Sequence, residues 1–144
     1  MLDTNVVSSL SPVSGDMSDG LARWLRVQSE QDKLFLSVVT IHEISKGITL
    51  LKRKGANAKA DRLGLWLDTV KTNFSDRLIP FDAESAIVAG ELEADALSRG
   101  FGPGMADAMI AATAKLNGLT VVTRNLRHFK PLEIDVISPL DVSV

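Results

Sequence analysis

Short runs of apolar residues alternate along this chain with longer segments in which apolar residues recur every three or four positions. The short runs, bounded by polar or turn residues, predict buried strands at residues 34–39, 77–81, 119–123 and 136–137. The longer segments predict helices at residues 18–31, 40–54, 61–74, 83–99 and 106–117. Gly118 directly follows the last of these, where a glycine commonly ends a helix in a left-handed conformation.

Strands that alternate with helices predict an α/β fold built around a mainly parallel central sheet. The 144 residues are enough for one domain and too few for two. Glycine- and proline-containing segments at residues 8–20 and 100–104 are expected to be loops. We therefore expect a single domain over residues 1–144.

Four polar side chains lie at or near the ends of the predicted strands. Asp3 follows Met1-Leu2, Glu43 follows the run at 34–39, and Asn125 follows the run at 119–123. Asp107 opens the helix that precedes this last strand. Because ligands of parallel sheets gather beyond the carboxyl ends of the strands, these residues are expected to converge on one rim.

Three carboxylates in one pocket repel one another, by about 4 kcal/mol per pair at ~4 Å and an effective dielectric near 20. They must take up protons or a cation. With no cysteine and only two histidines in the chain, the ligands would be oxygens, which favours Mg²⁺ or Mn²⁺. Asp3 and Asp107 are the expected direct ligands. Glu43 would bind the ion directly, act through a water on it, or serve as a general base.

Charge and hydropathy narrow the function further. A net charge of −2 and a pI near 5.6 disfavour a protein that coats nucleic acid nonspecifically. A nuclease remains compatible, because bound cations neutralise an acidic site. No apolar run is long enough to span a bilayer and no secretory signal is recognisable, so we expect a cytoplasmic protein without a membrane partner.

The polar side chains near the predicted strand ends also have purely structural interpretations. Thr40 and Glu43 have the spacing of a helix capping box. Asp107 would complement a helix dipole, and Asn125 would occupy an ordinary turn. Thr123 would orient Asp3 or simply end a strand. The case for a site rests on their joint occurrence.

Basic residues beside the predicted rim offer contacts for RNA phosphates or for a partner's carboxylates, although plain solvation explains them equally well. The cluster near the last strand consists of Arg124, Arg127, His128 and Lys130. Lys46, one helical turn from Glu43, is the best candidate on its helix. His42 points away from Glu43 and is expected to be structural.

Several of these segments together resemble PIN-domain proteins, most closely the VapC/FitB branch of type II toxin–antitoxin ribonucleases. They are LDTNVVS at 2–8, SVVTIHE at 37–43, ADAMIAATA at 106–114, NGL at 117–119 and VTRN at 122–125 with Phe129. Their order is that of the family, and the likeness extends from residue 2 to about residue 139.

The resemblance implies a three-layer α/β/α sandwich and Mg²⁺- or Mn²⁺-dependent endonucleolytic cleavage of RNA. It also implies a homodimer and inhibition by a small VapB/FitA-like antitoxin, through which alone the protein would reach promoter DNA. By matching positions, the acidic roles fall to Asp3, Glu43 and Asp107, and the supporting polar roles to Asn5, Thr123 and Asn125.

Two features depart from the family pattern. Asn125 stands where aspartate is common, so a second metal ion would bind weakly or arrive with RNA. Few residues precede Asp3, so the first strand is either completed by few backbone pairs or begins upstream of Met1.

Two other functions stay open at this point. One is a catalytically silent PIN-like module that only binds its antitoxin partner. The other is a phosphatase with Asp3 as nucleophile, which is disfavoured because Asn5 replaces the second aspartate that such enzymes need.

Overall fold

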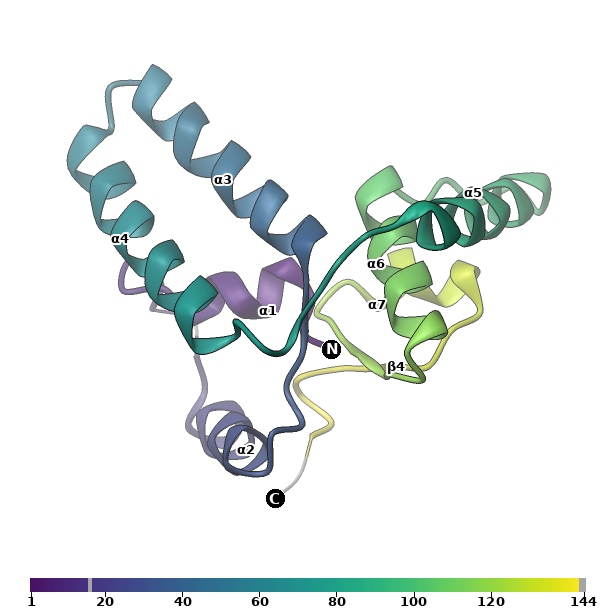
Figure 1. Cartoon of the computed structure of the whole chain (residues 1–144), viewed down its shortest axis with the longest axis horizontal. Helices are drawn as coiled ribbons and strands as arrows, with labels where there is room; N and C mark the ends of the chain where they lie inside the picture. The colour runs from purple at the N-terminus through teal and green to yellow at the C-terminus, as the bar shows by residue number, and fades with distance from the viewer. Residues whose placement is uncertain (16, 143–144) are drawn as a thin grey trace.

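The structure is a computed structural model that describes residues 1–15 and 17–142 (Figure 1). Its elements, in chain order, are α1 (Thr4–Ser9), α2 (Asp19–Glu30), β1 (Leu36–Ser37), α3 (Val38–Arg53), α4 (Asn57–Asn73), β2 (Leu78–Ile79), α5 (Ala83–Ser98), α6 (Met105–Leu116), β3 (Val121–Val122), α7 (Leu126–Phe129), the 3₁₀ helix η1 (Lys130–Leu132) and β4 (Val136–Ile137). Within the described ranges, no helix has the length and apolar character needed to cross a membrane.

The first three residues join two parallel strand pairs. β1 pairs with β2, and β3 pairs with β4. Between them, the Leu2 amide donates to the carbonyl of Phe35 (2.9 Å) and the Asp3 amide to that of Val122 (3.0 Å). The Val122 amide donates back to Met1 (2.9 Å). The spatial order is therefore β2, β1, residues 1–3, β3, β4, and the central strand is completed by these few backbone bonds.

Alternating residues of the strands enter two separate apolar clusters. Leu2, Leu36, Leu78, Val122 and Ile137 pack with the buried sides of α1, α2, α3 and α4. Their chain neighbours Met1, Phe35, Ile79, Val121 and Val136 pack with α5, α6, α7 and η1. Because neighbouring strand residues point to opposite faces, the two clusters are the two faces of one sheet. This confirms the three-layer α/β/α sandwich with a parallel centre.

The predicted strand at residues 34–39 is wrong for its last two positions. Helix α3 begins at Val38, because the Ser37 hydroxyl accepts a hydrogen bond from the Val39 amide (3.1 Å) and caps the helix. Two β-branched valines indicated a strand, but the cap and the packing of Val39 in the core outweigh that local preference. The remaining predicted strands are likewise only two residues long.

Other helix boundaries also differ from the prediction. α4 begins at Asn57, four residues before the predicted start at residue 61. The predicted loop at residues 8–20 is shorter at both ends, because α1 ends at Ser9 and α2 begins at Asp19, and residue 16 lies outside the described residues. No helix was predicted for α1, α7 or η1, which are short and carry little periodic signal.

Gly118 has the predicted role. Its φ of +62° lies in the left-handed region, where a side chain is disfavoured. The Leu119 amide donates to the Ala114 carbonyl (2.9 Å) and the Gly118 amide to the Lys115 carbonyl (3.3 Å), the two bonds of a Schellman motif. This turn leads the chain from α6 directly into β3.

Candidate active site

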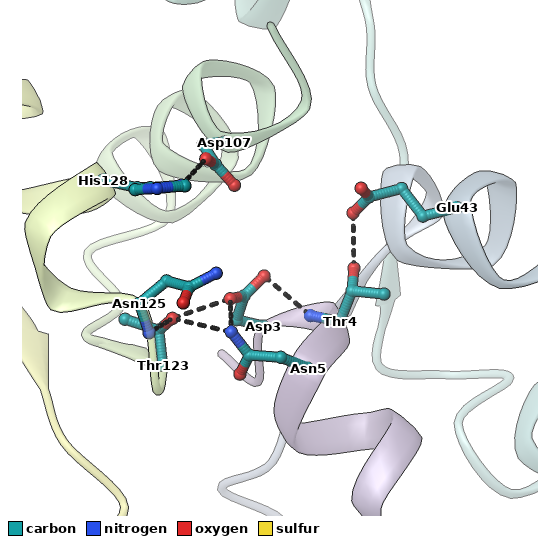
Figure 2. A network of polar contacts seen from close by, with 8 residues as sticks. All are labelled: Asp3, Thr4, Asn5, Glu43, Asp107, Thr123, Asn125 and His128. Carbon is teal, nitrogen blue, oxygen red and sulfur yellow. Dashed lines mark hydrogen bonds and ion pairs between the residues drawn. The ribbon is translucent and has the colours of Figure 1, made fainter. Parts of the chain in front are cut away.

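Asp3 lies at the end of the central strand and begins α1. Its Oδ1 accepts a hydrogen bond from the Thr4 amide (2.7 Å), which caps the helix. Its Oδ2 accepts from Asn5 Nδ2 and from Thr123 Oγ1, each at 2.7 Å (Figure 2). The residue is 4% exposed. Three donors therefore fix a buried carboxylate in a single orientation.

Burial raises the pKa of Asp3 to about 6, from an ordinary value of 3.8. The hydrogen bonds from Thr123 and Thr4 lower it, and the negative charges of Asp107 and Glu43 raise it. The three carboxylates therefore act on one another electrostatically. Such a site is stabilised by a proton or by a cation.

Glu43 reaches this site from α3. Thr4 Oγ1 donates to Glu43 Oε1 at 2.6 Å (Figure 2). It also lies 3.2 Å from Thr40 Oγ1. The capping-box interpretation of Thr40 and Glu43 is wrong, because Ser37 caps α3 and Thr40 is fully buried inside its first turn. The sequence pattern assigned no separate role to Thr4, yet Thr4 bonds to both Asp3 and Glu43 and so links the central strand to α3.

Asp107 lies in the first turn of α6 and faces Asp3 across the site. Its Oδ2 is 3.0 Å from His128 Nδ1 (Figure 2). Its side chain is 19% exposed, against 41% for His128. The sequence placed His128 in a surface basic cluster, whereas the structure pairs it with a carboxylate. The sequence feature that could have indicated a place for His128 at the site is its position one helical turn beyond Asn125.

The supporting polar residues form one network around Asp3. Asn5 Nδ2 also lies 3.2 Å from Thr123 Oγ1, and Asn5 Oδ1 accepts from the Arg124 amide (3.2 Å). The buried Thr123 hydroxyl accepts from the Asn125 amide (3.0 Å). The Asn125 side chain does not cap α7, and in Figure 2 its amide lies beside the Asp3 carboxylate.

The two basic residues singled out from the sequence are both exposed. Lys46 is exposed on α3, one turn after Glu43. Arg124 is exposed and lines a cavity of about 330 Å³ together with Ser18 and Leu21.

The donor set fits a hard divalent cation in its chemistry, because every ligand atom on offer is a carboxylate or amide oxygen. Glu43 Oε2 and Asp107 Oδ1 take part in none of the hydrogen bonds described above. Across residues 1–15 and 17–142, however, no three acidic or histidine side chains lie close enough to enclose one ion. The carboxylates thus face one another without closing a cage.

A groove of about 650 Å³ begins at Thr4 and Glu43 and runs between α1, α3 and α4. Its polar wall carries Ser8, Ser11 and Lys59. Its apolar wall consists of Ile44, Ile48, Leu51, Leu63 and Trp66. Of the three carboxylates, only Glu43 lines this groove.

Comparison with known proteins agrees with this arrangement. The PIN domain family model matches residues 1–133. The chain is 32% identical to Toxin FitB of Neisseria gonorrhoeae and 31% identical to VapC ribonuclease Y4jK of Sinorhizobium fredii, with 96% of each chain covered in both cases. The crystal structure of FitAcB from Neisseria gonorrhoeae superposes with a TM-score of 0.78 at 31% identity, covering 98% of both chains. DNA-bound VapBC from Salmonella typhimurium, at 23% identity and a TM-score of 0.78 over 96% of both chains, shares the fold. The chain therefore belongs to the PIN-domain family.

Proposed function

We propose that this protein is a divalent-metal-dependent endoribonuclease and the toxin of a type II toxin–antitoxin pair. The observation that supports this most directly is the raised pKa of Asp3, which results from its burial and from the negative charges of Asp107 and Glu43, two carboxylates from distant parts of the chain. Relatives of nearly the same length named as a VapC ribonuclease and as Toxin FitB support the assignment.

In this proposal Asp3 and Asp107 bind one Mg²⁺ or Mn²⁺. When bound, the ion supplies positive charge that stabilises the charge developing on a phosphodiester and makes a nearby water more acidic. Thr4, Asn5 and Thr123 hold the Asp3 carboxylate in place through their hydrogen bonds.

Glu43 completes the set, either as a further ligand or as the base that takes a proton from the attacking water. The Thr4 hydroxyl holds its Oε1, which leaves Oε2 for this role. Asn125 offers a neutral oxygen beside the carboxylates, so we propose one tightly bound ion rather than two. Lys46 and Arg124 are proposed to contact RNA phosphates farther from the reacting bond.

The proposed partners are a small antitoxin, an RNA substrate and a second copy of the chain. Two of the solved neighbours are FitAB bound to a DNA fragment and VapBC2 from Rickettsia felis bound to promoter DNA. The groove beside Glu43 suits an antitoxin segment, because it offers an apolar wall to side chains and reaches the carboxylate of Glu43. DNA would be contacted through the antitoxin, since the toxin itself is acidic.

RNA cleavage by the purified, antitoxin-free chain tests the nuclease. We expect cleavage in Mn²⁺ or Mg²⁺, none in chelator, and a loss of at least about 100-fold in Asp3→Ala and Asp107→Asn. Asp68→Asn, an exposed acid on α4, is the matched control and should cleave normally. Persistent cleavage by a well-folded Asp107→Asn protein would reject the assigned site.

A catalytically silent module is the second candidate, favoured by the neutral Asn125 and by the open arrangement of the carboxylates. Calorimetric titration with millimolar Mn²⁺, with and without RNA, separates the two. Absence of binding under both conditions would favour the silent module. The phosphatase alternative stays disfavoured, because the Asn5 amide donates a hydrogen bond to Asp3 and offers no second carboxylic acid.

A further inference from the structure

The contact between His128 and Asp107 joins a residue outside the assigned acidic set to one of its carboxylates. The Nδ1 to Oδ2 distance of 3.0 Å is that of a hydrogen bond. Because a carboxylate oxygen only accepts, the histidine ring must donate from Nδ1. Oδ1, the other oxygen of Asp107, remains outside this bond.

The fold fixes His128 at this position. α7 starts directly after the loop that carries Thr123 and Asn125, and the His128 amide donates to the Asn125 carbonyl (2.9 Å). The next residue, Phe129, is fully buried and anchors the short helix in the core cluster that also contains α6. The histidine ring is therefore held against the first turn of α6.

Without this hydrogen bond, the backbone amides at the start of α6 would compete for the Asp107 carboxylate. The first turn of a helix has unsatisfied amide donors, and an acidic residue there readily turns back toward them. The N-cap of α6 is Gly104, which has no side chain to satisfy these donors. A Cβ on Gly104 would lie 3.5 Å from Asp107 Oδ2, so the oxygen nearest the start of α6 is the one that His128 holds.

We propose that His128 is a positioning residue that orients Asp107 for the divalent ion by donating from Nδ1 to Oδ2. The inference rests on the proposed metal-dependent function. Partners that orient metal-binding side chains typically affect metal affinity by about 10- to 100-fold. His128 acts through Asp107 and needs no contact with RNA.

Mn²⁺ titration of the metal-free protein by calorimetry tests this role. We expect His128→Leu to weaken Mn²⁺ binding by about 10- to 100-fold. His128→Asn should bind nearly as well as the native protein, because the asparagine amide nitrogen lies close to the position of Nδ1. His128→Gln should be weak, because its amide nitrogen lies near the position of Nε2 instead.

His42→Leu is the matched control, since His42 is the other histidine of the chain and is exposed on α3. It should bind Mn²⁺ normally. The Asn and Gln variants differ by one methylene and are both polar, so their comparison remains decisive if the leucine variant fails to fold.

Cleavage kinetics give a second readout. The KM for RNA at saturating Mn²⁺ should be unchanged in His128→Gln, whereas the Mn²⁺ concentration needed for half-maximal rate should rise. A raised KM for RNA with unchanged Mn²⁺ affinity would overturn the inference and assign His128 to RNA binding. Equal Mn²⁺ affinity in the Asn, Gln and native proteins would also overturn it. If the native protein neither binds Mn²⁺ nor cleaves RNA, the proposed function fails and the inference fails with it.

Discussion

Asp3 combines two roles that usually belong to different residues. As the N-cap of α1 it accepts the Thr4 amide, a stabilising contact that any ionised or neutral cap could make. As a buried carboxylate near Asp107 and Glu43 it is costly to ionise. Capping alone does not require a carboxylate that is buried near two others. The unfavourable free energy of ionising Asp3 therefore indicates a functional group.

The raised pKa of Asp3 predicts an unusual pH dependence for the metal-free protein. The folded state binds the proton with a pKa of about 6 and the unfolded chain with its ordinary value of 3.8. The folded state thus holds more protons between these values, and the contribution of Asp3 to stability falls as the pH rises through about 6. We expect the native protein to lose up to about 3 kcal/mol relative to Asp3→Asn between pH 4 and pH 8.

Urea unfolding of both proteins in chelator at several pH values measures this difference. The comparison is needed because burial lowers the pKa of the Met1 amine from 8.0 to about 6, so this group raises the stability as the pH rises from about 6 to 8. Added Mn²⁺ should restore the native protein above pH 6, since it binds the ionised carboxylate. A difference between the two proteins that does not vary with pH would contradict the prediction.

Helix ends, more than helix interiors, bring the acidic residues together. Asp3 caps α1, Asp107 lies in the first turn of α6, and Glu43 follows the Ser37 cap of α3 by about two turns. α1 and α3 begin directly after strand residues, whereas α6 begins after the loop that follows α5. The position at which each helix begins therefore decides whether its carboxylate reaches the site.

Two glycines, one at the end of α6 and one within α4, give a stability prediction with an internal control. Gly118→Ala should destabilise the fold by about 1 kcal/mol, because a φ of +62° is unfavourable for a residue with a Cβ. Gly64→Ala lies within α4 with no atom within 4 Å of the new Cβ, and should stabilise by roughly 0.5 to 1 kcal/mol.

Thermal or urea unfolding distinguishes the two signs. Equal effects of the two substitutions would show that backbone conformation at Gly118 does not control the end of α6. Cleavage by Gly64→Ala should match the native protein, because Gly64 lies on the far side of α4 from the groove beside Glu43.

On the scale of the whole molecule, α5 leaves an apolar stripe exposed. Ala83, Ile87, Gly90, Ala94 and Leu97 recur at helical spacing and are all exposed, with Ile87 64% and Leu97 56% accessible. Phe101 and Met105 continue this surface into the loop before α6 and its first turn. Large side chains gathered in this way are typical of a protein interface.

We expect this stripe to be the contact between two copies of the chain. Ile87→Glu would place a charge in the contact and should weaken self-association by roughly 30-fold or more. Leu65→Glu, at an exposed leucine on α4, is the control and should leave the dimer intact. Light scattering during size-exclusion chromatography measures both. A dimer that persists unchanged in Ile87→Glu would move the contact elsewhere.

The sequence by itself determined the order of the longer helices and the strands and the parallel α/β class, and it singled out the acidic residues proposed for the site. These follow from local periodicity and from carboxylates placed beside apolar runs, both of which are readable without long-range contacts. Gly118 was predictable for the same reason, because the left-handed turn it allows depends on that residue alone.

Only the tertiary structure decided where α3 begins, how Thr4 connects Asp3 to Glu43, and which donor holds Asp107. Each of these depends on side chains far apart in the chain: Thr4 and Glu43 are separated by 39 residues, Asp107 and His128 by 21. Local preference favoured a strand through Val38 and Val39 and a capping box at Thr40. Instead, Val39 packs in the core within α3, and Glu43 accepts a hydrogen bond from Thr4. These contacts form only once the sheet has brought the segments together, so local preference does not predict them.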